Sequence, residues 1–151
     1  MAKRFFEDLT VGEVIALPPA PVTRDAIIAF AREYDPQPFH LEDGHPASGL
    51  TDEGLIASGW HVCAIFMRML CDGLLLESSC LGSPGIESLK WQRTVHPGDT
   101  LTGRSTVLAA RASETKRDRG IVRFRHEVFN QRGETVMTLD NPVFFGRRSV
   151  S

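Results

Sequence analysis

The sequence predicts an α+β fold, in which a long antiparallel sheet curves around one apolar helix. The run from Gly59 to Asp72 contains no proline and is apolar almost all round, as expected of a buried helix. From residue 86 onward, apolar and polar residues alternate in segments of about ten residues separated by tight turns, which indicates an antiparallel meander. Because a buried helix needs a covering layer, we expect the meander to wrap it.

The size and charge of the chain narrow its possible roles. Its 151 residues fit one domain, 1–151, with its own hydrophobic core. A net charge of −2 and a pI near 6.2 give no electrostatic reason to expect a nucleic-acid or anionic-membrane partner. Residues 1–13 carry acids where a signal peptide needs an apolar core, and the longest apolar run, Val62–Met69, is too short to span a bilayer. These features predict a cytoplasmic protein with no membrane partner.

The three cysteines, Cys63, Cys71 and Cys80, predict neither a disulfide framework nor a zinc site. Their number is odd and no C-x-x-C spacing occurs. In a reducing compartment such thiols pack as small hydrophobic side chains.

The N-terminal third contains a predicted helix. The proline-rich segment 16–23 is interpreted as a short connection into it. Thr23 is the expected N-cap, and apolar residues at i, i+3, i+4 and i+7 from Ile27 predict an amphipathic helix through about Glu33. The helix should end by Asp35, because the residue before a proline avoids the α region.

Two prolines stiffen the segment "DPQPFH", which runs from Asp35 to His40. Pro36 and Pro38 fix two φ angles and bias the residues before them toward extended conformations. The segment therefore has few conformations to lose when its acid and its imidazole are positioned, which suits a preorganised acid–base pair. In the alternative interpretation, Asp35 only turns the loop and His40 is a half-buried histidine with satisfied hydrogen bonds.

The central helix follows an irregular, glycine-rich loop at residues 43–54. Between Trp60 and Cys71 its only strongly polar residues are His61 and Arg68, which lie seven apart and share one narrow stripe. Gly73 stands where a C′ glycine would end the helix.

The C-terminal half contains the predicted strands 86–95, 101–110, 121–130 and 134–145, with a charged hairpin tip at 111–120. In 121–130, Val122, Phe124 and Val128 fall on one face. In 86–95, Trp91 alternates in phase with Leu89, which predicts that Trp91 packs in the core.

Taken in order, these motifs resemble the MaoC-type acyl dehydratases, a hot-dog-fold family that includes the (R)-specific enoyl-CoA hydratases. The resemblance covers nearly the whole chain and is most specific in the D-x-x-P-x-H element at 35–40 and in "ASGW" at 57–60, before and at the start of the helix. It also runs through "FFEDLTVGE", "HPGDTL", "RDRG" and "NQRGE". It implies a hot-dog fold, with a long central helix inside a curved antiparallel sheet.

The resemblance also implies roles for particular residues. It makes Asp35 and His40 the catalytic pair and the backbone N–H of Gly59 the oxyanion donor, with Ser58 and Trp60 contacting the substrate. The implied reaction is reversible addition of water to a trans-2-enoyl-CoA in fatty acid metabolism, by a homodimer or a multiple of dimers. No metal or cofactor is expected beyond the coenzyme A of the substrate thioester.

The chain departs from its relatives in two places. It has "TDEG" at 51–54, where an aromatic–Gly–Gly turn is usual, and it is apolar around Met67, where some hydratases carry a serine. Asp52 and Glu53 are expected near the pocket rim, where they would repel acyl groups that end in a carboxylate.

The chemistry agrees with the implied roles and leaves alternatives open. Hydration of an enoyl thioester needs a base for the water, an acid for the α-carbon and stabilisation of the enolate oxygen. A helix N-terminus offers unpaired N–H groups at Gly59, although Ser58 could simply cap the helix while Gly59 relieves crowding against the sheet. A metal site of Asp35, His40 and His45 is a further alternative.

The sequence also leaves open which residues contact coenzyme A and which reaction is catalysed. Coenzyme A phosphates could meet basic residues of the hairpin region, or these residues could simply be solvated: Arg104, Arg111, Lys116, Arg117 and Arg119. An acyl-CoA thioesterase and a non-catalytic acyl-CoA-binding subunit are the alternatives to a hydratase.

Overall fold

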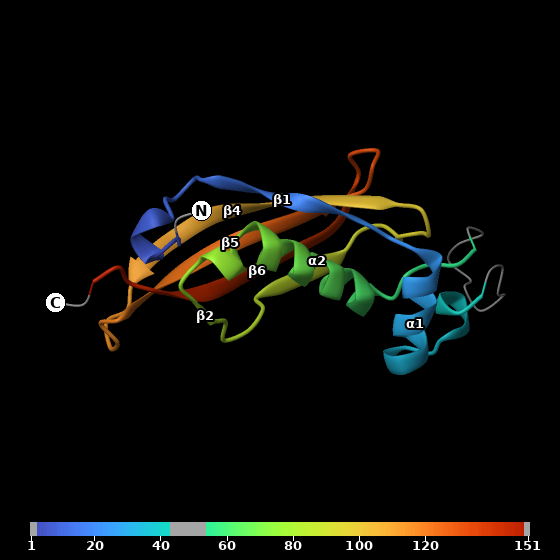
Figure 1. The fold of residues 1–151 in the computed structure, drawn as a ribbon, viewed down its shortest axis with the longest axis horizontal. Helices are drawn as coiled ribbons and strands as arrows, with labels where there is room; N and C mark the ends of the chain where they lie inside the picture. Colours follow the sequence, from blue (N-terminus) through green and yellow to red (C-terminus); the bar gives the residue numbers. More distant parts are fainter. Residues whose placement is uncertain (1–2, 43–53, 150–151) are drawn as a thin grey trace.

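The computed structural model describes residues 3–42 and 54–149, and it contains one antiparallel sheet that curves along a central helix (Figure 1). The sheet runs in the order β1-β4-β5-β6-β2, and β3 also pairs with β6. The strands are β1 (Val14–Pro21), β2 (Cys80–Gly82), β3 (Ser88–Trp91), β4 (Thr100–Ala112), β5 (Arg119–Phe129) and β6 (Thr135–Gly146). The predicted α+β class and the hot-dog arrangement are both confirmed.

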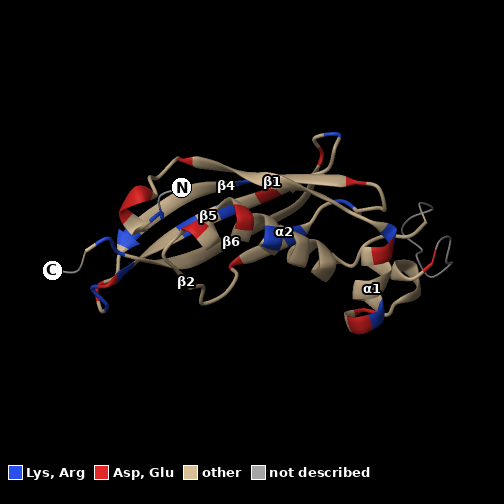
Figure 2. Ribbon diagram, in the orientation of Figure 1, with Lys and Arg blue, Asp and Glu red and all other residues tan. Residues whose placement is uncertain are grey.

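Strand alternation places the core on one face of the sheet. In β5, Val122, Phe124 and Val128 are buried, whereas Arg123 and Arg125 point to the other face. β5 is paired along its length with β4 on one side and β6 on the other, so its buried residues lie at the centre of the core. Figure 2 shows basic and acidic residues interspersed along the strands, in keeping with the small net charge.

The proline-rich segment before the first helix is a strand, which corrects its interpretation as a connection. Within the part of the chain that the structure describes, β1 is an edge strand that pairs with β4 alone, and its register shifts between Leu17 and Ala20. Pro18 and Pro19 fall within this irregularity. Prolines, which lack an N–H, are tolerated at sheet edges and bulges because no ladder hydrogen bond is lost there.

The first helix, α1 (Arg24–Tyr34), agrees with its prediction at both ends. The Ala26 N–H donates to Thr23 Oγ1 at 3.2 Å, and the helix ends where Asp35 precedes a proline. A short 3₁₀ turn, η2 (Pro38–His40), follows and carries the imidazole of His40.

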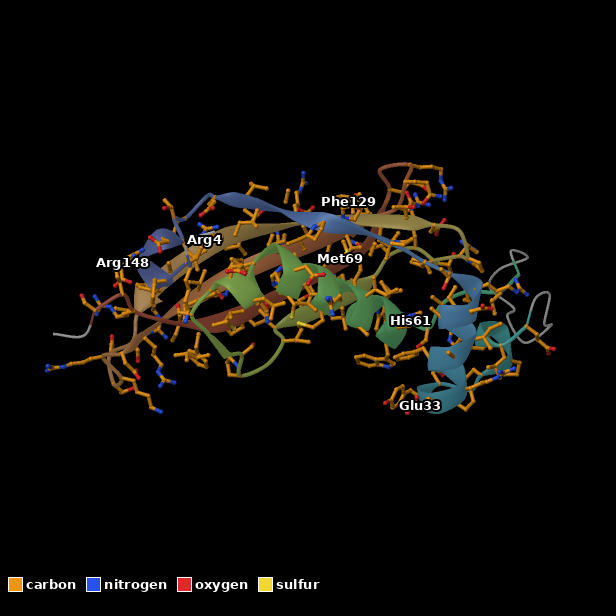
Figure 3. All side chains as sticks on the ribbon, viewed as in Figure 1. Arg4, Glu33, His61, Met69, Phe129 and Arg148 are labelled. Atoms are coloured by element: carbon orange, nitrogen blue, oxygen red, sulfur yellow. The ribbon has the colours of Figure 1, made fainter. Side chains whose placement is uncertain are left out.

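The central helix, α2 (Gly59–Gly73), is buried on one face only. Phe66, Met69 and Leu70 are buried against the sheet, whereas Trp60 is 59% exposed and Met67 is 46% exposed. The expectation that this helix is buried all round is therefore wrong for a single chain. Figure 3 shows Met69 midway along α2 and His61 at the end that faces α1.

By length and composition the stretch Gly59–Glu77 also qualifies as a possible membrane span, with 19 residues and a mean hydropathy of 1.4. The core helix of a soluble protein meets the same criterion. Here the helical run breaks after Gly73, and a separate 3₁₀ turn, η4 (Leu75–Glu77), completes the stretch.

Gly73 belongs to α2 rather than following it. A Cβ at this position would lie 3.0 Å from the side chains of Leu17 and Pro18, so the glycine allows β1 to approach the last turn of the helix. Close approach, not a left-handed cap, explains this glycine.

β3 is shorter than the predicted strand 86–95, because the chain leaves the ladder after Trp91. The N–H groups of Gln92 and Arg93 both turn to the carbonyl of Val136, at 2.9 and 3.4 Å. The alternation therefore stops at Trp91, which is 45% exposed instead of packing in the core. Val95, farther on, is buried.

Candidate active site

The proline-stiffened segment Asp35–His40 and the extended residues 54–58, which lead into α2, lie against each other. The Ile56 N–H donates to the carbonyl of Phe39 at 3.1 Å, and the Ala57 N–H donates to that of Val95 at 2.8 Å. The residues leading into α2 are therefore held between the His40 turn and the chain that follows β3. Asp35, His40 and the first turn of α2 meet at this point.

Asp35 and His40 are brought together by their side chains. His40 is buried, and its Nε2 lies 3.3 Å from Asp35 Oδ2. Its Nδ1 lies 2.8 Å from the carbonyl oxygen of Ile56. Because a carbonyl only accepts, Nδ1 carries a proton and donates to Ile56, so the ring is oriented with Nε2 directed toward Asp35.

The Asp35 carboxylate is held in its ionised form. Burial alone would raise its pKa, but hydrogen bonds from the Ser58 hydroxyl and the Gln37 amide, together with the nearby imidazole of His40, lower it overall. The Ser58 Oγ–H donates to Oδ2 and the Gln37 Nε2–H donates to Oδ1, both at 2.6 Å. Both oxygens are thus oriented by donors, and Asp35 serves as an acceptor near neutral pH.

Gly59 presents its backbone N–H at the start of α2. The Trp60 N–H donates to Ser58 Oγ at 3.3 Å, and the N–H groups of His61 and Val62 donate to the Ser58 carbonyl. Within residues 3–42 and 54–149, nothing accepts from the Gly59 N–H. It combines with the positive end of the helix macrodipole to make a donor for a developing negative oxygen.

Gly59 is also required by the indole of Trp91. A Cβ at residue 59 would lie 2.5 Å from Trp91 Cε2, far inside van der Waals contact. The Trp91 Nε1–H donates to the Gly59 carbonyl at 3.0 Å, and Trp60 packs edge-on against Trp91 with ring centroids 5.2 Å apart. Relief of crowding and an exposed N–H therefore occur together at Gly59. Sequence reasoning missed Trp91 as a site residue, because strand alternation assigned it to the core.

These groups line one cavity of about 280 Å³. The residues that line it are His40, Ile56, Ala57, Gly59, Val62, Trp91, Gln92, Arg93, Thr94 and Val95. The cavity therefore combines an imidazole, a helix N-terminus and apolar walls. Asp35, Ser58 and Trp60 are not among these residues: Asp35 reaches the cavity only through its contact with His40, Ser58 is buried and bonded to Asp35, and Trp60 lies outside on Trp91. Substrate contacts by Ser58 and Trp60 stay a prediction.

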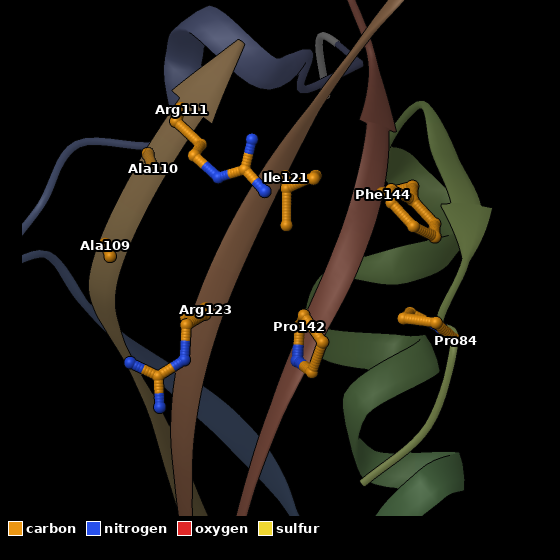
Figure 4. Close-up of a pocket in the computed structure, with 8 residues that line it drawn as sticks. All are labelled: Pro84, Ala109, Ala110, Arg111, Ile121, Arg123, Pro142 and Phe144. Atoms are coloured by element: carbon orange, nitrogen blue, oxygen red, sulfur yellow. The ribbon is translucent and has the colours of Figure 1, made fainter. Parts of the chain in front are cut away.

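A larger cavity, about 520 Å³, lies on the face of β4, β5 and β6 that is turned away from α2 (Figure 4). It is lined by Pro84, Ala109, Ala110, Arg111, Ile121, Arg123, Pro142 and Phe144. These residues provide neither a carboxylate nor an imidazole, so the smaller cavity is the candidate active site.

The other candidate residues lie away from this cavity or outside the described residues. His61 is buried and stacks on Phe30 with ring centroids 4.9 Å apart, so it joins α2 to α1. Burial lowers its pKa. Asp52, Glu53 and His45 fall outside the described residues. Among residues 3–42 and 54–149 there is no cluster of three His, Cys, Asp or Glu side chains that could hold a metal ion.

The basic residues of the hairpin region do not lie beside the cavity. The β4–β5 turn is at the end of the sheet opposite α1 and the first turn of α2 (Figure 1). Arg119 pairs there with Asp118 at 2.9 Å, and Arg104 pairs with Glu127 at 2.9 Å on the face away from α2.

Comparison with known proteins agrees with this arrangement. The sequence profile of the family described as "MaoC like domain" matches residues 7–130. The crystal structure of a MaoC-like dehydratase from Rhodospirillum rubrum is 40% identical, with a TM-score of 0.87 over 97% of this chain and 99% of that one. An (R)-hydratase of A. caviae involved in PHA biosynthesis is 25% identical, with a TM-score of 0.70 over 91% and 97% of the two chains.

A third structure supports the fold alone. RV0216 of Mycobacterium tuberculosis, described as a double hot-dog fold, is 18% identical and has a TM-score of 0.77. The match covers 96% of this chain but 44% of that one, as expected when one chain carries two copies of the unit.

Proposed function

Because the chain belongs to the MaoC-like dehydratase family, we propose that it is a hydro-lyase that adds water reversibly to a trans-2-enoyl-CoA, giving the 3-hydroxyacyl-CoA. One observation carries the proposal. The Asp35 carboxylate lies 3.3 Å from an imidazole nitrogen of His40, and His40 lines a cavity together with Gly59, whose N–H has no acceptor within residues 3–42 and 54–149. These are the acid–base and oxyanion groups that the reaction needs.

In this proposal one water bridges the pair and donates one hydrogen bond to each partner. Imidazole is the side chain whose charge changes near neutral pH, so His40 Nε2 takes a proton from the water as its oxygen adds to the β-carbon. The same Nε2–H then protonates the α-carbon. Asp35, whose lowered pKa keeps it from supplying a proton, orients the water and stabilises the imidazolium.

Gly59 stabilises the charge that moves to the thioester oxygen. As water adds to the β-carbon, the electron pair of the double bond shifts and the carbonyl oxygen becomes an enolate. A fixed N–H donor at such an oxygen contributes about 3 kcal/mol to the transition state. The scheme uses only these side chains and the backbone, with coenzyme A as part of the substrate.

The proposed assembly is a homodimer or a multiple of dimers. Trp60 and Met67 are exposed on the open side of α2. Trp91 is exposed on the edge strand β3, and Ile86 is exposed just before it. An exposed apolar face beside an unpaired edge is a liability that a second copy can cover. HadBC of M. tuberculosis, a 20% identical structure with a TM-score of 0.64, is described as a complex. Light scattering tests the proposal, and a monodisperse monomer would contradict it.

The activity is tested with a panel of short, medium and branched enoyl-CoAs, by loss of the conjugated thioester absorbance. We expect hydration of at least one member, with kcat lowered by about 10²–10⁴ in His40→Gln. Release of free coenzyme A, detected with a chromogenic thiol reagent, would instead identify a thioesterase. Tight binding of acyl-CoA without turnover would identify a non-catalytic subunit.

A further inference from the structure

We propose that a polar basin beside the candidate active site binds the phosphate of a phosphopantetheine thioester, with Arg93 and Arg132 as the ligands. The proposal rests on the proposed function and identifies the part of the substrate, the phosphopantetheine arm, that binds beside the site. The basin has a volume of about 230 Å³. It is lined by Gln92, Arg93, Thr94, His96, Asn130, Arg132 and Glu134.

The basin and the catalytic cavity share a wall. Gln92, Arg93 and Thr94 line both. These residues leave the ladder after β3, and this bend places them between the first turn of α2 and the β5–β6 hairpin. A thioester whose carbonyl reaches Gly59 can therefore extend its phosphopantetheine arm along this wall into the basin. The Gln92 carboxamide is a polar group on that route, suited to the amides of a pantetheine arm.

Two arginines of the basin meet at one glutamate. Arg93 Nη1 lies 3.3 Å from Glu134 Oε2, and Arg132 Nε lies 2.8 Å from Glu134 Oε1. One carboxylate is thus shared by two guanidinium groups. Each guanidinium has five N–H donors and both side chains are more than half exposed, so a phosphate can be bound without breaking either pair.

The β5–β6 hairpin holds Arg132 in a defined position. The Asn130 Oδ1 accepts from the N–H groups of Arg132 and Glu134, at 3.0 and 3.1 Å, and the Asn130 Nδ2–H donates to Glu134 Oε1 at 3.0 Å. Gly133 closes the turn with φ at +76°, which favours glycine. A preorganised turn reduces the entropy lost when a phosphate binds.

The test compares three thioesters of the same enoyl group: the pantetheine, the phosphopantetheine and the coenzyme A thioester. Only the first lacks phosphate. We expect Arg93→Gln and Arg132→Gln each to lower kcat/KM about tenfold for the two phosphorylated substrates. Arg132 does not line the catalytic cavity, so Arg132→Gln should leave kcat/KM for the pantetheine thioester unchanged. Arg125→Gln is the matched control, because Arg125 is an exposed arginine paired with one carboxylate, Asp140, on β5 and β6.

A substitution of the competing carboxylate gives an effect of opposite sign. Glu134→Gln keeps an acceptor for the Asn130 amide and removes the negative charge, so it should raise kcat/KM for the phosphorylated substrates only. Equal losses on all three thioesters in Arg132→Gln, or a wild-type enzyme that does not prefer phosphorylated substrates, would overturn the proposal. Melting temperatures identify variants that fail to fold, and Arg93→Lys, which keeps the charge, then replaces Arg93→Gln.

The same phosphopantetheine group occurs in coenzyme A and in acyl carrier protein. A fourth substrate, the enoyl thioester of holo-acyl carrier protein, distinguishes these two sources. A preference for either source supports phosphate binding in the basin, provided that the arginine variants lower kcat/KM for the preferred thioester. If the wild type hydrates none of these thioesters, the proposed function fails. Calorimetric binding of coenzyme A then decides on the basin alone: weaker binding to Arg93→Gln than to wild type supports it, and equal binding overturns it.

Discussion

Replacing Gly59 by alanine tests whether the indole of Trp91 requires a glycine at this position. The added Cβ would lie 2.5 Å from Trp91 Cε2 and 2.8 Å from Cδ2 and Cζ2, whereas ordinary contacts begin near 3.4 Å. The indole must therefore move by about 1 Å, which breaks its 3.0 Å hydrogen bond to the Gly59 carbonyl. Overpacking of this kind costs about 1–3 kcal/mol of unfolding free energy, and the lost hydrogen bond adds about 1 kcal/mol.

The effect on activity follows from the position of Trp91 in the cavity wall. The backbone N–H of residue 59 is retained in Gly59→Ala, but a wall displaced by about 1 Å can lower kcat/KM about a hundredfold. We expect this loss in the hydration assay, together with the loss of stability in urea unfolding.

The control is a double-mutant cycle with Trp91→Leu, which removes the ring that the new Cβ meets. In the double variant the overlap is absent, so Gly59→Ala should cost at least 1 kcal/mol less than in the wild-type background. Near-normal stability and activity of Gly59→Ala alone would refute the reasoning, because the close contact would then be absent in solution. Full additivity of the two substitutions would refute it as well.

Three further predictions concern protons. Asp35→Asn and His40→Gln should each lower kcat by about 10²–10⁴ with little change in melting temperature, and the double variant should be barely worse than either, since the two act as a unit; near-normal turnover in either single variant would contradict the shared water. Ser58→Ala removes a hydrogen bond that lowers the pKa of Asp35, so the acidic limb of the pH–kcat/KM profile should move to higher pH, and an unmoved limb would contradict this role. Burial lowers the pKa of His126 from 6.5 to about 4, so as the pH falls the unfolded chain binds a proton on this residue before the folded chain does. The stability that depends on a neutral His126 is complete above pH 6.5, and about 3 kcal/mol of it is lost as the pH falls to 4. Urea unfolding should show a smaller loss in His126→Gln.

Much of the fold follows from local rules that can be read along the chain. The Thr23 cap and the stop at Asp35 depend on side-chain and proline sterics within a few residues, and both are found where they were predicted. The alternation in β5 depends on the two-residue period of a strand, so its buried set was also predictable. The Asp35–His40 pair was identified by its spacing and its resemblance to a family, because both residues lie in one short stiffened segment.

The remaining features of the site are contacts between segments far apart in the sequence. The Ser58 hydroxyl reaches Asp35 across 23 residues, and the indole of Trp91 reaches Gly59 across 32. Periodicity placed Trp91 in the core because it cannot show where a strand leaves its ladder, an event decided here by the carbonyl of Val136. It likewise could not bring Arg93 beside Arg132, which depends on how a bend and a hairpin meet.

The sequence by itself thus determined the ends of α1 and the buried face of β5, because helix caps, proline sterics and strand alternation act over a few residues. It also pointed to Asp35 and His40 as a candidate pair, through their spacing and the family resemblance. Tertiary structure alone decided what orients Asp35, what covers Gly59 and which side of α2 is left open. The physical reason is that burial and hydrogen-bond partners are properties of packed surfaces, which form only when distant segments meet.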